Sequence, residues 1–301
     1  MEPSVHIPVL LHEVLAHLGP RPGGRYVDAT VNGGGHARAL LDASAPDGRV
    51  LGLDRDPTIL DALRARSAGA IERGRLILCN SSFASLTEVV AAQSFAPVNG
   101  VLFDLGISSY HLDASGRGFS VLRDEPLDMR FDAGDAERET AADILATRNG
   151  DELAELFRSY GEERFASRIA RTIVARRREA ALRTTGELLA AIEQSLPPPV
   201  RWRAARDAAR VFQALRIAVN AELDAVAAAL PQALAALAPG GRLVAISFHS
   251  LEDRLVKQFL REAERAGRVR ILTKRPIRPA DAEVADNPRA ASAKVRAAER
   301  T

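Results

Sequence analysis

The sequence predicts an α/β fold with a parallel sheet, and two observations lead to this prediction. Short apolar runs rich in valine, leucine and isoleucine alternate with helical patterns, which is typical of strands buried on both faces of a parallel sheet. A run that ends at Asp28 leads through consecutive glycines into helix-forming residues, which is typical of the nucleotide-binding corner of a doubly wound sheet. The predicted strands are residues 26–28, 50–54, 76–80, 101–104 and 243–247.

Helical periodicity accounts for the rest of the chain. Between strands, residues 57–71 begin with a proline suited to a first helical turn. From about residue 113 the strand signals stop, and helical patterns follow at residues 136–147, 151–160, 162–179 and 185–195. An alanine-rich helical stretch over 207–237, with an expected break at Pro231, leads back to a strand. We therefore predict an α/β domain of residues 1–112 and 213–301, interrupted by an all-helical insertion at 113–212.

Composition is that expected of a cytoplasmic enzyme. The 301 residues are 47% hydrophobic, enough for one sizeable core and a smaller satellite. The longest apolar runs are far shorter than the roughly 20 residues of a membrane span, and no signal-peptide pattern begins the chain. Cys79 is the only cysteine and the six histidines form no ligand motif, so we expect no disulfide and no metal. Because the net charge is only +2, nucleic-acid affinity would have to come from local patches.

The stretch YVDATVNGGGHARALLD, residues 26–42, is a candidate cofactor-binding loop. Its consecutive glycines are Gly33, Gly34 and Gly35. They match neither G-x-G-x-x-G nor the P-loop, and Asp28 beside them would repel a diphosphate but attract an ammonium group. Asp54 ends the next strand, where a carboxylate can reach ribose hydroxyls. S-adenosylmethionine, which has an amino group and a ribose but no phosphate, fits better than NAD; alternatively, the glycines only permit a tight turn.

Polar residues end the other predicted strands as well. Asn80, Asp104 and segment 247–250 should meet the glycine loop, because the carboxyl ends of parallel strands share one edge. Asp104 follows its strand directly in GVLFDLGISS. We favour a site role for Asp104, although a helix or turn cap would also explain it.

The segment SFHSLEDR, residues 247–254, closes the last predicted strand. Ser250 and Asp253 have the spacing of a capping box for a helix over residues 251–266. That interpretation leaves His249 unexplained. A contact with substrate or cofactor and a satisfied structural histidine are both open for this residue.

Basic residues concentrate in two segments that could face RNA. One face of the helical pattern in the insertion carries Arg164, Arg168, Arg171 and Arg178. The carboxyl-terminal segment 268–301 holds a second cluster, which includes Arg289, Lys294, Arg296 and Arg300. Both segments are predicted either to contact phosphates or to form solvated, mobile surface.

A series of short motifs occurs in order along the chain. They are HIPVLLHEVL (6–15), DAT and GGGH (28–36), LDRDP (53–57), DLGISS (104–109), RGFS (117–120), PLDMR (126–130), YGEER (160–164), FQALRIAVNAEL (212–223), SFHSLEDR (247–254) and NPRAASAKVR (287–296). Together they resemble the bacterial family that methylates N4 of a cytidine in 16S ribosomal RNA of the small subunit. The resemblance covers nearly the whole chain and implies a class I, Rossmann-like methyltransferase core with an inserted helical domain.

The resemblance also implies a binding site for S-adenosyl-L-methionine. The residues carried over by position are Gly34, Gly35 and His36 against the cofactor, Asp54 on the ribose, Phe83 near the adenine, and Asp104 and His111 completing the pocket. The chain departs from the family pattern at Asn32, Tyr110, His111 and Ala291. At Asn32 the family usually has glycine.

The implied reaction joins a methyl carbon to an amine whose lone pair is delocalised into the cytosine ring. A carboxylate that accepts a hydrogen bond from the amino group would localise the lone pair and stabilise developing positive charge. We predict this role for Asp104, with His249 and Asp113 as further candidates around the base. The base must be unstacked to react, and the helical insertion is a candidate RNA clamp.

The expected partner is the small ribosomal subunit or its RNA, and the sequence leaves both a monomer and a homodimer open. Two other classes of function stay under consideration. An NAD-dependent oxidoreductase is one, although Asp28 beside the glycines argues against it. A non-catalytic RNA-binding protein is the other, and it would bind RNA without binding the cofactor.

Overall fold

The computed structural model describes residues 8–301, so His6 and Ile7 of the first motif lie outside the described residues. The chain divides into two compact units. The first unit contains the residues up to Ser108 together with Leu223–Thr301, and the second is Ser109–Glu222. The second unit therefore extends beyond the predicted insertion, 113–212, at both ends.

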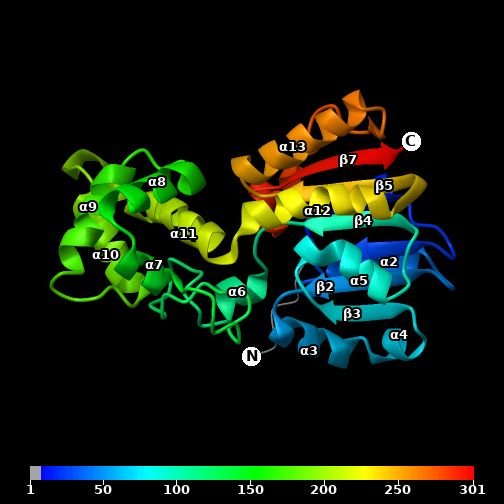
Figure 1. Ribbon diagram of the computed structural model, residues 1–301, viewed down its shortest axis with the longest axis horizontal. Helices are drawn as coiled ribbons and strands as arrows, with labels where there is room; N and C mark the ends of the chain where they lie inside the picture. The colour runs from blue at the N-terminus through cyan, green and yellow to red at the C-terminus, as the bar shows by residue number, and fades with distance from the viewer. Residues whose placement is uncertain (1–7) are drawn as a thin grey trace. The chain divides into compact units, whose positions relative to one another are not determined.

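The first unit is built on a seven-stranded sheet with the order β3-β2-β1-β4-β5-β7-β6 (Figure 1). The strands are β1 (Arg25–Asp28), β2 (Arg49–Asp54), β3 (Leu76–Asn80), β4 (Val98–Asp104), β5 (Leu237–Ser247), β6 (Val269–Ile271) and β7 (Lys294–Arg300). Neighbouring strands are parallel except that β7 runs antiparallel to both β5 and β6. The α/β prediction and its five strands are confirmed.

Helices cover both faces of this sheet. One face packs against α1 (Leu11–Leu18), α2 (Gly35–Ala43) and α3 (Pro57–Arg66), and the other against α5 (Leu86–Ala92), α12 (Glu222–Ala236) and α13 (Ser250–Arg265). Side chains alternate along a strand, so Val50 packs on the first face while Leu51 and Leu53 pack on the second. The remaining elements of this unit are α4 (Ala68–Glu72), η1 (Phe83–Ser85), α14 (Asp281–Asp286) and η3 (Pro288–Ser292).

Sheet topology places the candidate site at the carboxyl ends of β1 and β4. From β1 the chain builds outward to β2 and β3, and it then crosses back to pair β4 on the opposite side of β1. Ligands bind in doubly wound sheets at the carboxyl edge where the strand order reverses. Asp28 is the last residue of β1 and Asp104 the last of β4, so both carboxylates lie at this position.

The carboxyl-terminal segment is part of the sheet, which corrects the prediction of a solvated, mobile tail. Strand β7 lies between β5 and β6, and its central residues are buried. Arg296 on β7 is 8% exposed, and its Nε donates to Asp253 Oδ1 over 2.6 Å. Lys294 Nζ lies 3.7 Å from the same carboxylate. A strand this rich in charged residues lacks the apolar run on which strand prediction relies.

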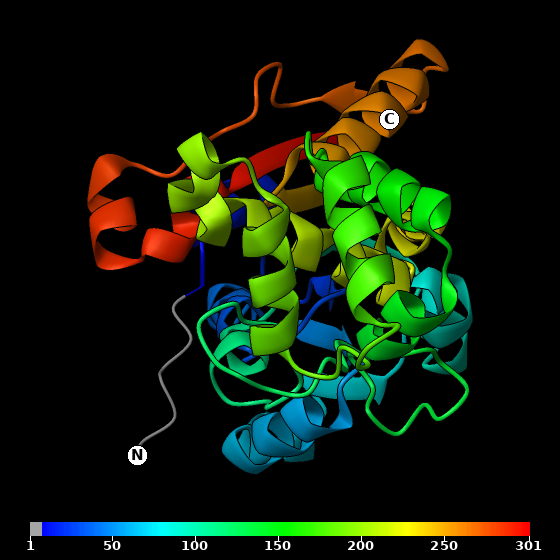
Figure 2. The ribbon, with the colours of Figure 1, turned by 90° about the vertical axis from the view of Figure 1, so that its left-hand side faces the viewer.

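The second unit consists of helices, which Figures 1 and 2 show packed side by side. They are α6 (Ser109–Asp113), α7 (Ala141–Thr147), α8 (Gly150–Gly161), α9 (Ala166–Arg176), α10 (Thr185–Ser195), η2 (Pro198–Arg203) and α11 (Ala204–Asn220). Capping boxes begin three of them, with the N-cap residues Thr140, Asn149 and Thr184. Helix α8 packs against both α9 and α11, so all of α11 belongs to this unit rather than starting a core segment at residue 213.

The predicted break at Pro231 is wrong. The long helical stretch breaks at Ala221, which has a left-handed φ of 49°, and Pro231 lies inside α12. The break follows from Asn220, whose side chain accepts from Phe131 N and donates to Met129 O instead of facing solvent. Pro231 is exposed, so the helix tolerates the loss of one amide on its solvent side.

We expect Arg296→Met to destabilise the first unit, because it removes the guanidinium that donates to the poorly solvated Asp253 carboxylate and leaves only the more distant charges of Lys294 and Lys257. The free energy of unfolding should fall by about 1–3 kcal/mol. Denaturant unfolding followed by circular dichroism measures this. The matched control is Arg278→Met at an exposed position, which should change stability by less than about 0.5 kcal/mol. Equal midpoints for the two variants would contradict a stabilising role of the pair.

Candidate active site

The loop after β1 is fixed by backbone hydrogen bonds to both neighbouring strands. Ala29 N donates to Leu102 O of β4 over 2.9 Å, and Val31 N donates to Leu53 O of β2 over 2.8 Å. The loop then turns into α2. Because it is held on both sides, the loop presents Asp28 and the glycines at a defined position on the sheet edge.

Backbone conformation and close packing explain why glycines occur in this loop. Gly34 has a left-handed φ of 79°, and a Cβ there would lie 2.4 Å from Leu63 Cδ1. A Cβ on Gly35 would lie 3.1 Å from the Pro8 ring. Gly33 is a partly exposed residue of the same turn. The turn therefore requires Gly34 for its backbone conformation and its packing, so the bare presence of glycines identifies no ligand.

Asn32 also adopts a left-handed conformation, with φ 46°. Asparagine tolerates this region better than most residues, which explains its presence where the related family usually has glycine. Its backbone N–H donates to Asp54 Oδ2 over 3.0 Å and so connects the glycine loop to the end of β2. Asn32 thus acts through its backbone within the turn.

Asp28, His36 and Asp104 form a buried cluster of ionisable groups at the ends of β1 and β4. Their exposed fractions are 1%, 4% and 6%. His36 Nε2 lies 3.0 Å from the carbonyl oxygen of Val9, and His36 Nδ1 lies 3.5 Å from Asp104 Oδ2. Since both ring nitrogens face oxygen acceptors, the doubly protonated imidazolium suits this position better than either neutral tautomer.

Burial and mutual charge set the protonation of this cluster. Desolvation raises the pKa of Asp28 to about 7, against opposing effects of the His36 charge and the Thr30 amide. Burial lowers the pKa of His36, but the hydrogen bond and charge of Asp104 and the charge of Asp28 outweigh it, so the pKa is raised. Asp28 can therefore exchange a proton near neutral pH, and His36 favours its protonated form.

Two carboxylate oxygens in this cluster have no hydrogen-bond donor among the described residues. They are Asp28 Oδ2 and Asp104 Oδ1, and both atoms are buried. A buried oxygen without a donor is costly, so each is suited to a ligand that brings N–H groups or positive charge. This pair of hydrogen-bond acceptors fits an amine or ammonium group and disfavours a phosphate.

Asp54 lies at the end of β2, as expected for a ribose-binding carboxylate. Its Oδ1 accepts from Asp56 N over 2.9 Å, and its Oδ2 accepts from Asn32 N. Desolvation raises the pKa of Asp54 to about 6, although these amides favour the ionised form. Its side chain is partly exposed, and each oxygen keeps a lone pair for a hydroxyl donor.

Asn80 ends β3, the strand next to the one that Asp54 ends, and Phe83 begins the short helix η1 that follows β3. The side-chain amide of Asn80 donates to the carbonyl oxygens of Asp54 and Arg55, both over 3.0 Å, so it fixes the ends of β2 and β3. Phe83 is partly buried, and its ring packs edge-on against Phe103 with centroids 5.7 Å apart. Phe83 therefore presents a rigid aromatic surface at the same edge of the sheet as Asp54.

His249 is the N-cap of α13, which corrects the predicted capping box of Ser250 and Asp253. Its Nδ1 accepts from Glu252 N over 3.4 Å, and the Glu252 carboxylate accepts from His249 N in return. Asp253 instead pairs with Arg296. The helix begins one residue earlier than the Ser/Asp spacing suggests, since histidine is an uncommon cap. These contacts give His249 a structural role as an N-cap, and its predicted catalytic role stays a prediction.

His111 and Asp113 belong to α6 of the helical unit rather than to the sheet edge. The buried His111 ring lies 5.0 Å, between centroids, from each of the Phe119 and Phe131 rings. Arg117 holds this segment by donating to the Phe131 carbonyl oxygen over 2.7 Å. Phe119 of the RGFS motif and Phe131, the residue that follows PLDMR, thus form an aromatic cluster around His111, a role that the motifs alone do not indicate.

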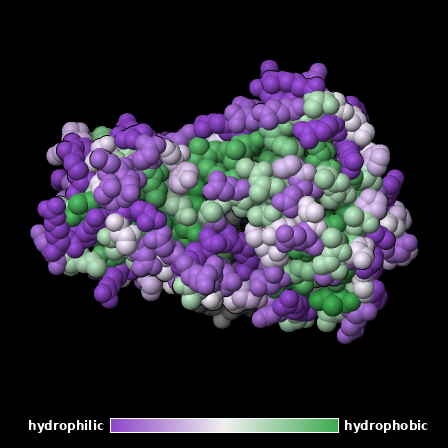
Figure 3. All heavy atoms as spheres, in the orientation of Figure 1, coloured by the Kyte–Doolittle hydropathy of each residue, from purple (hydrophilic) through white to green (hydrophobic). Residues whose placement is uncertain are grey.

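The arginine face of the insertion lines an open groove between α9 and α10. The groove has a volume of about 640 Å³ and is lined by Arg168, Arg171, Thr172, Ala175, Arg176, Glu179, Gln194 and Ser195. Arg164 stacks on Phe165 outside this lining, and Arg178 is exposed beyond the end of α9. Figure 3 shows hydrophilic residues over most of the visible surface of this unit. The structure therefore groups Arg168 and Arg171 with Arg176, which the sequence analysis missed.

A second basic hollow lies in the first unit, between α13 and the segment after β6. Its volume is about 320 Å³, and its lining includes Lys257, Arg261, Lys274 and Arg296. These residues come from α13, the segment after β6 and strand β7, so spacing in the sequence could not reveal the group. Of the predicted tail residues, Arg296 is committed to Asp253, whereas Arg289 is exposed on η3. The predicted contact of Arg296 with phosphates stays a prediction, and its ion pair with Asp253 is the contact that the structure shows.

Two further features concern the described residues, 8–301, alone. No group of three or more histidine, cysteine, aspartate or glutamate side chains is arranged there to hold a metal ion. None of the helices there has the length and hydropathy needed to span a membrane.

We expect Asp28→Asn to stabilise the ligand-free protein at alkaline pH. Folded Asp28 keeps its proton up to about pH 7, whereas the ordinary value is 3.8, so ionising it costs folding stability as the pH rises through this window. The amide removes that cost and should add about 1–3 kcal/mol at pH 8 and almost nothing near pH 4. Thermal unfolding across this pH range measures the difference. Asp61→Asn, at an exposed carboxylate on α3, should show no such pH dependence; a pH-independent effect of Asp28→Asn would refute the assignment.

Comparison with known proteins assigns the chain to a family. The description of the matching family model is "MraW methylase family", and the match spans residues 3–301. The chain is 49% identical to ribosomal RNA small subunit methyltransferase H of Thermomicrobium roseum, over 99% of this chain and 94% of that protein. It is 47% identical to the protein of the same name from Heliobacterium modesticaldum, over 98% of each chain. With the sheet topology and the buried cluster described above, these matches show that the chain belongs to the MraW methylase family.

Proposed function

We propose that this protein transfers a methyl group from S-adenosyl-L-methionine to the exocyclic N4 of a cytidine in 16S ribosomal RNA of the small subunit. The observation that carries the proposal is the pair of buried carboxylate oxygens, Asp28 Oδ2 and Asp104 Oδ1, at the carboxyl ends of the two central strands. Its relatives are named for methylation of small-subunit ribosomal RNA, which supports the substrate class. We place its action in the cytoplasm, on the RNA or an assembled particle.

The residues at the sheet edge fit the cofactor. Asp28 would accept from its α-amino group, and the Asp54 carboxylate would accept from ribose hydroxyls. Phe83 would supply an apolar surface for the adenine, and the turn at Gly34 and Gly35 would border the ligand. When bound, the cofactor supplies a methyl carbon carried on a positively charged sulfur. The same carboxylates would repel the diphosphate of NAD, so the oxidoreductase alternative is disfavoured.

Asp104 is the residue that we assign to the reacting amine. Its Oδ1 lacks a donor among the described residues, while His36 lies on Oδ2 and Thr30 Oγ1 accepts from Asp104 N over 2.6 Å. These contacts fix the position of the carboxylate. An amino group that donates to Oδ1 would have its lone pair localised on nitrogen, and the carboxylate would stabilise the positive charge that develops there before one proton is lost.

The helical unit, residues 109–222, is assigned to RNA recognition. Arg168 and Arg171 line its groove with exposed side chains, and guanidinium groups are well suited to phosphate oxygens. Asp113 on α6 stays a candidate contact for the base. RNA that is held by such a unit must also expose its cytidine, because a stacked base cannot enter a pocket at the sheet edge.

We expect Asp104→Asn to lower the rate of methyl transfer by about 10²- to 10³-fold while leaving the fold intact, because the amide cannot stabilise the charge as the carboxylate does. Transfer of labelled methyl groups to small subunits from cells that lack this gene measures the rate. Asp61→Asn is the matched control and should keep full activity. Mass-spectrometric mapping of the modified nucleoside should give N4-methylated cytidine. Methylation of another atom would overturn the assignment of the target.

We expect Asp54→Asn to weaken S-adenosylmethionine binding by about 10- to 100-fold, because an amide is a weaker acceptor for two hydroxyl groups than a carboxylate. Calorimetric titration of the protein measures this affinity. Titration with NAD should give no heat. Binding of NAD would favour the oxidoreductase, and binding of RNA without either cofactor would favour the non-catalytic alternative.

A further inference from the structure

Trp202 is the only tryptophan of the chain, and its side chain is exposed to solvent. The residue is 82% exposed on the short helix η2, and among the described large apolar side chains only Leu122 is comparably exposed. Proline residues 197–199 precede it and restrict the backbone. An exposed indole on a stiff segment adds no packing to the helical unit, so its presence calls for a function.

The surface around Trp202 is basic. Arg203 Cζ lies 6.0 Å from the centre of the indole ring, within the range of a cation–π contact. Arg201 and Arg206 are exposed on the same segment. Asp207, the nearest acidic residue in the sequence, is buried beneath and pairs with Arg203 over 3.4 Å. The solvent-facing charge next to the indole is therefore positive.

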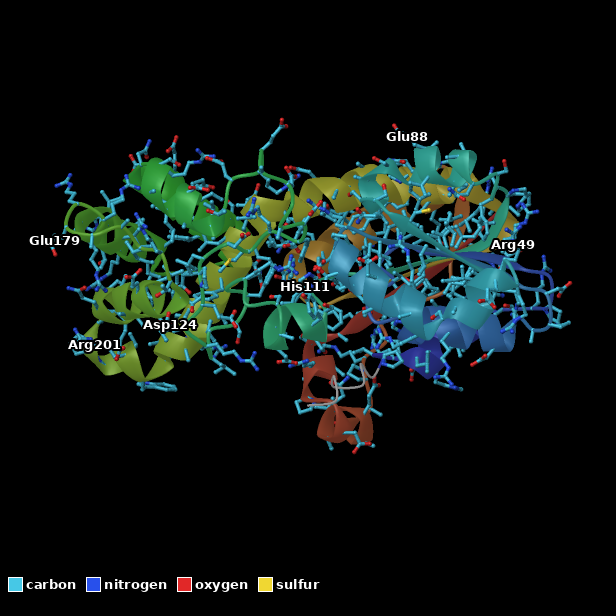
Figure 4. All side chains as sticks on the ribbon, turned by 90° about the horizontal axis from the view of Figure 1, so that it is seen from below. Arg49, Glu88, His111, Asp124, Glu179 and Arg201 are labelled. Atoms are coloured by element: carbon cyan, nitrogen blue, oxygen red, sulfur yellow. The ribbon has the colours of Figure 1, made fainter. Side chains whose placement is uncertain are left out.

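Two hydrogen bonds connect η2 to the arginine groove of α9 and α10. Arg168 Nε donates to the carbonyl oxygen of Ser195 over 3.0 Å, and Arg201 Nε donates to that of Leu196 over 3.3 Å. Because these carbonyls are consecutive, the groove and the Trp202 segment lie together at the carboxyl-terminal end of α10. In Figure 4, Glu179 of the groove and Arg201 lie at the same end of the helical unit.

We propose that Trp202 is a stacking platform for one unpaired base of the RNA substrate, with Arg168, Arg171 and Arg201 contacting the adjoining phosphates. An exposed aromatic ring beside guanidinium groups is the arrangement by which proteins bind single-stranded nucleic acid. The inference rests on the proposed function for its choice of RNA. It concerns a contact made by the helical unit, in addition to the target cytidine of the proposed function.

The local chemistry disfavours a second copy of the chain as the occupant. An apolar partner surface needs a contiguous patch, whereas Trp202 is a single ring surrounded by arginines. Two copies related by a twofold axis through this site would also bring equal positive charges together. RNA neutralises those charges, so the charge complementarity favours RNA.

The test uses Trp202 as its own reporter, because its emission is the only tryptophan signal of the protein. The full-length protein is titrated with a short single-stranded RNA that contains cytidines, and separately with a blunt RNA duplex of equal length. The single strand should quench the emission to saturation. The duplex, whose bases are already stacked, should quench it little at the same phosphate concentration.

Two variants provide the affinity measurement, with fluorescein-labelled RNA and anisotropy as the readout. Trp202→Ala should bind the single strand about 10- to 100-fold more weakly, the range that loss of one stacked base implies. Trp202→Phe should recover most of that loss. Leu122→Ala, which removes the other exposed apolar side chain of the same unit, should bind like the wild type.

Three other outcomes would contradict either the stacking platform or the proposed function. If the wild type binds and methylates RNA but neither quenching nor the Trp202→Ala loss is seen, the platform is refuted and the proposed function stands. If Trp202→Ala instead changes self-association in sedimentation and leaves RNA affinity unchanged, the site is an interface between copies, and the platform is again refuted. Absence of both RNA binding and methyl transfer in the wild type would count against the proposed function itself.

Discussion

Burial of Asp28, His36 and Asp104 together is the constraint on which the rest of the site depends. Water cannot solvate these groups, so each charge needs either another member of the cluster or a ligand to balance it. The surrounding backbone is arranged accordingly: the loop after β1 bonds to both neighbouring strands, and the Val9 carbonyl oxygen holds the far side of the imidazole. The fold therefore keeps a cluster of buried ionisable groups that lowers the stability of the folded protein. This is expected of a preorganised binding site rather than of a structural core.

Much of the first unit follows from the sequence because its signals are local. The five apolar runs became strands, and Asp28, Asp54 and Asp104 end three of them, since a parallel sheet collects its carboxyl ends at one edge. Contacts that form across the chain were not predictable in this way. The sequence of strand β7 carries too many charges to be predicted as a buried strand. It can be buried because Asp253, 43 residues earlier in the sequence, neutralises Arg296. The cap made by His249 and the enclosure of His111 by two phenylalanines likewise depend on tertiary neighbours.

The helical unit follows a different principle. Three of its helices begin at capping boxes, and its helices pack on one another, so its order arises from short-range contacts and from its own apolar core. This leaves its outer residues free to vary in charge and polarity without loss of the fold. The groove between α9 and α10 and the stiff segment that carries Trp202 are built on this scaffold, and both carry positive charge. In the proposed function, the sheet carries the chemistry and the helical unit carries the recognition of RNA.

The pairing of β4 with β5 has a consequence for synthesis of the chain. Strand β4 ends at Asp104 and strand β5 begins at Leu237, so the whole helical unit is translated between these two neighbouring strands. At about 5–20 residues per second, the first four strands wait roughly 7 to 26 seconds before β5 is synthesised. Independent folding of the helical unit would shorten the effective tether between β4 and β5 and reduce the entropy lost on closing it. An insertion that folded on its own would thus be a compact spacer during co-translational folding, and mutations that loosen it would slow maturation of the sheet.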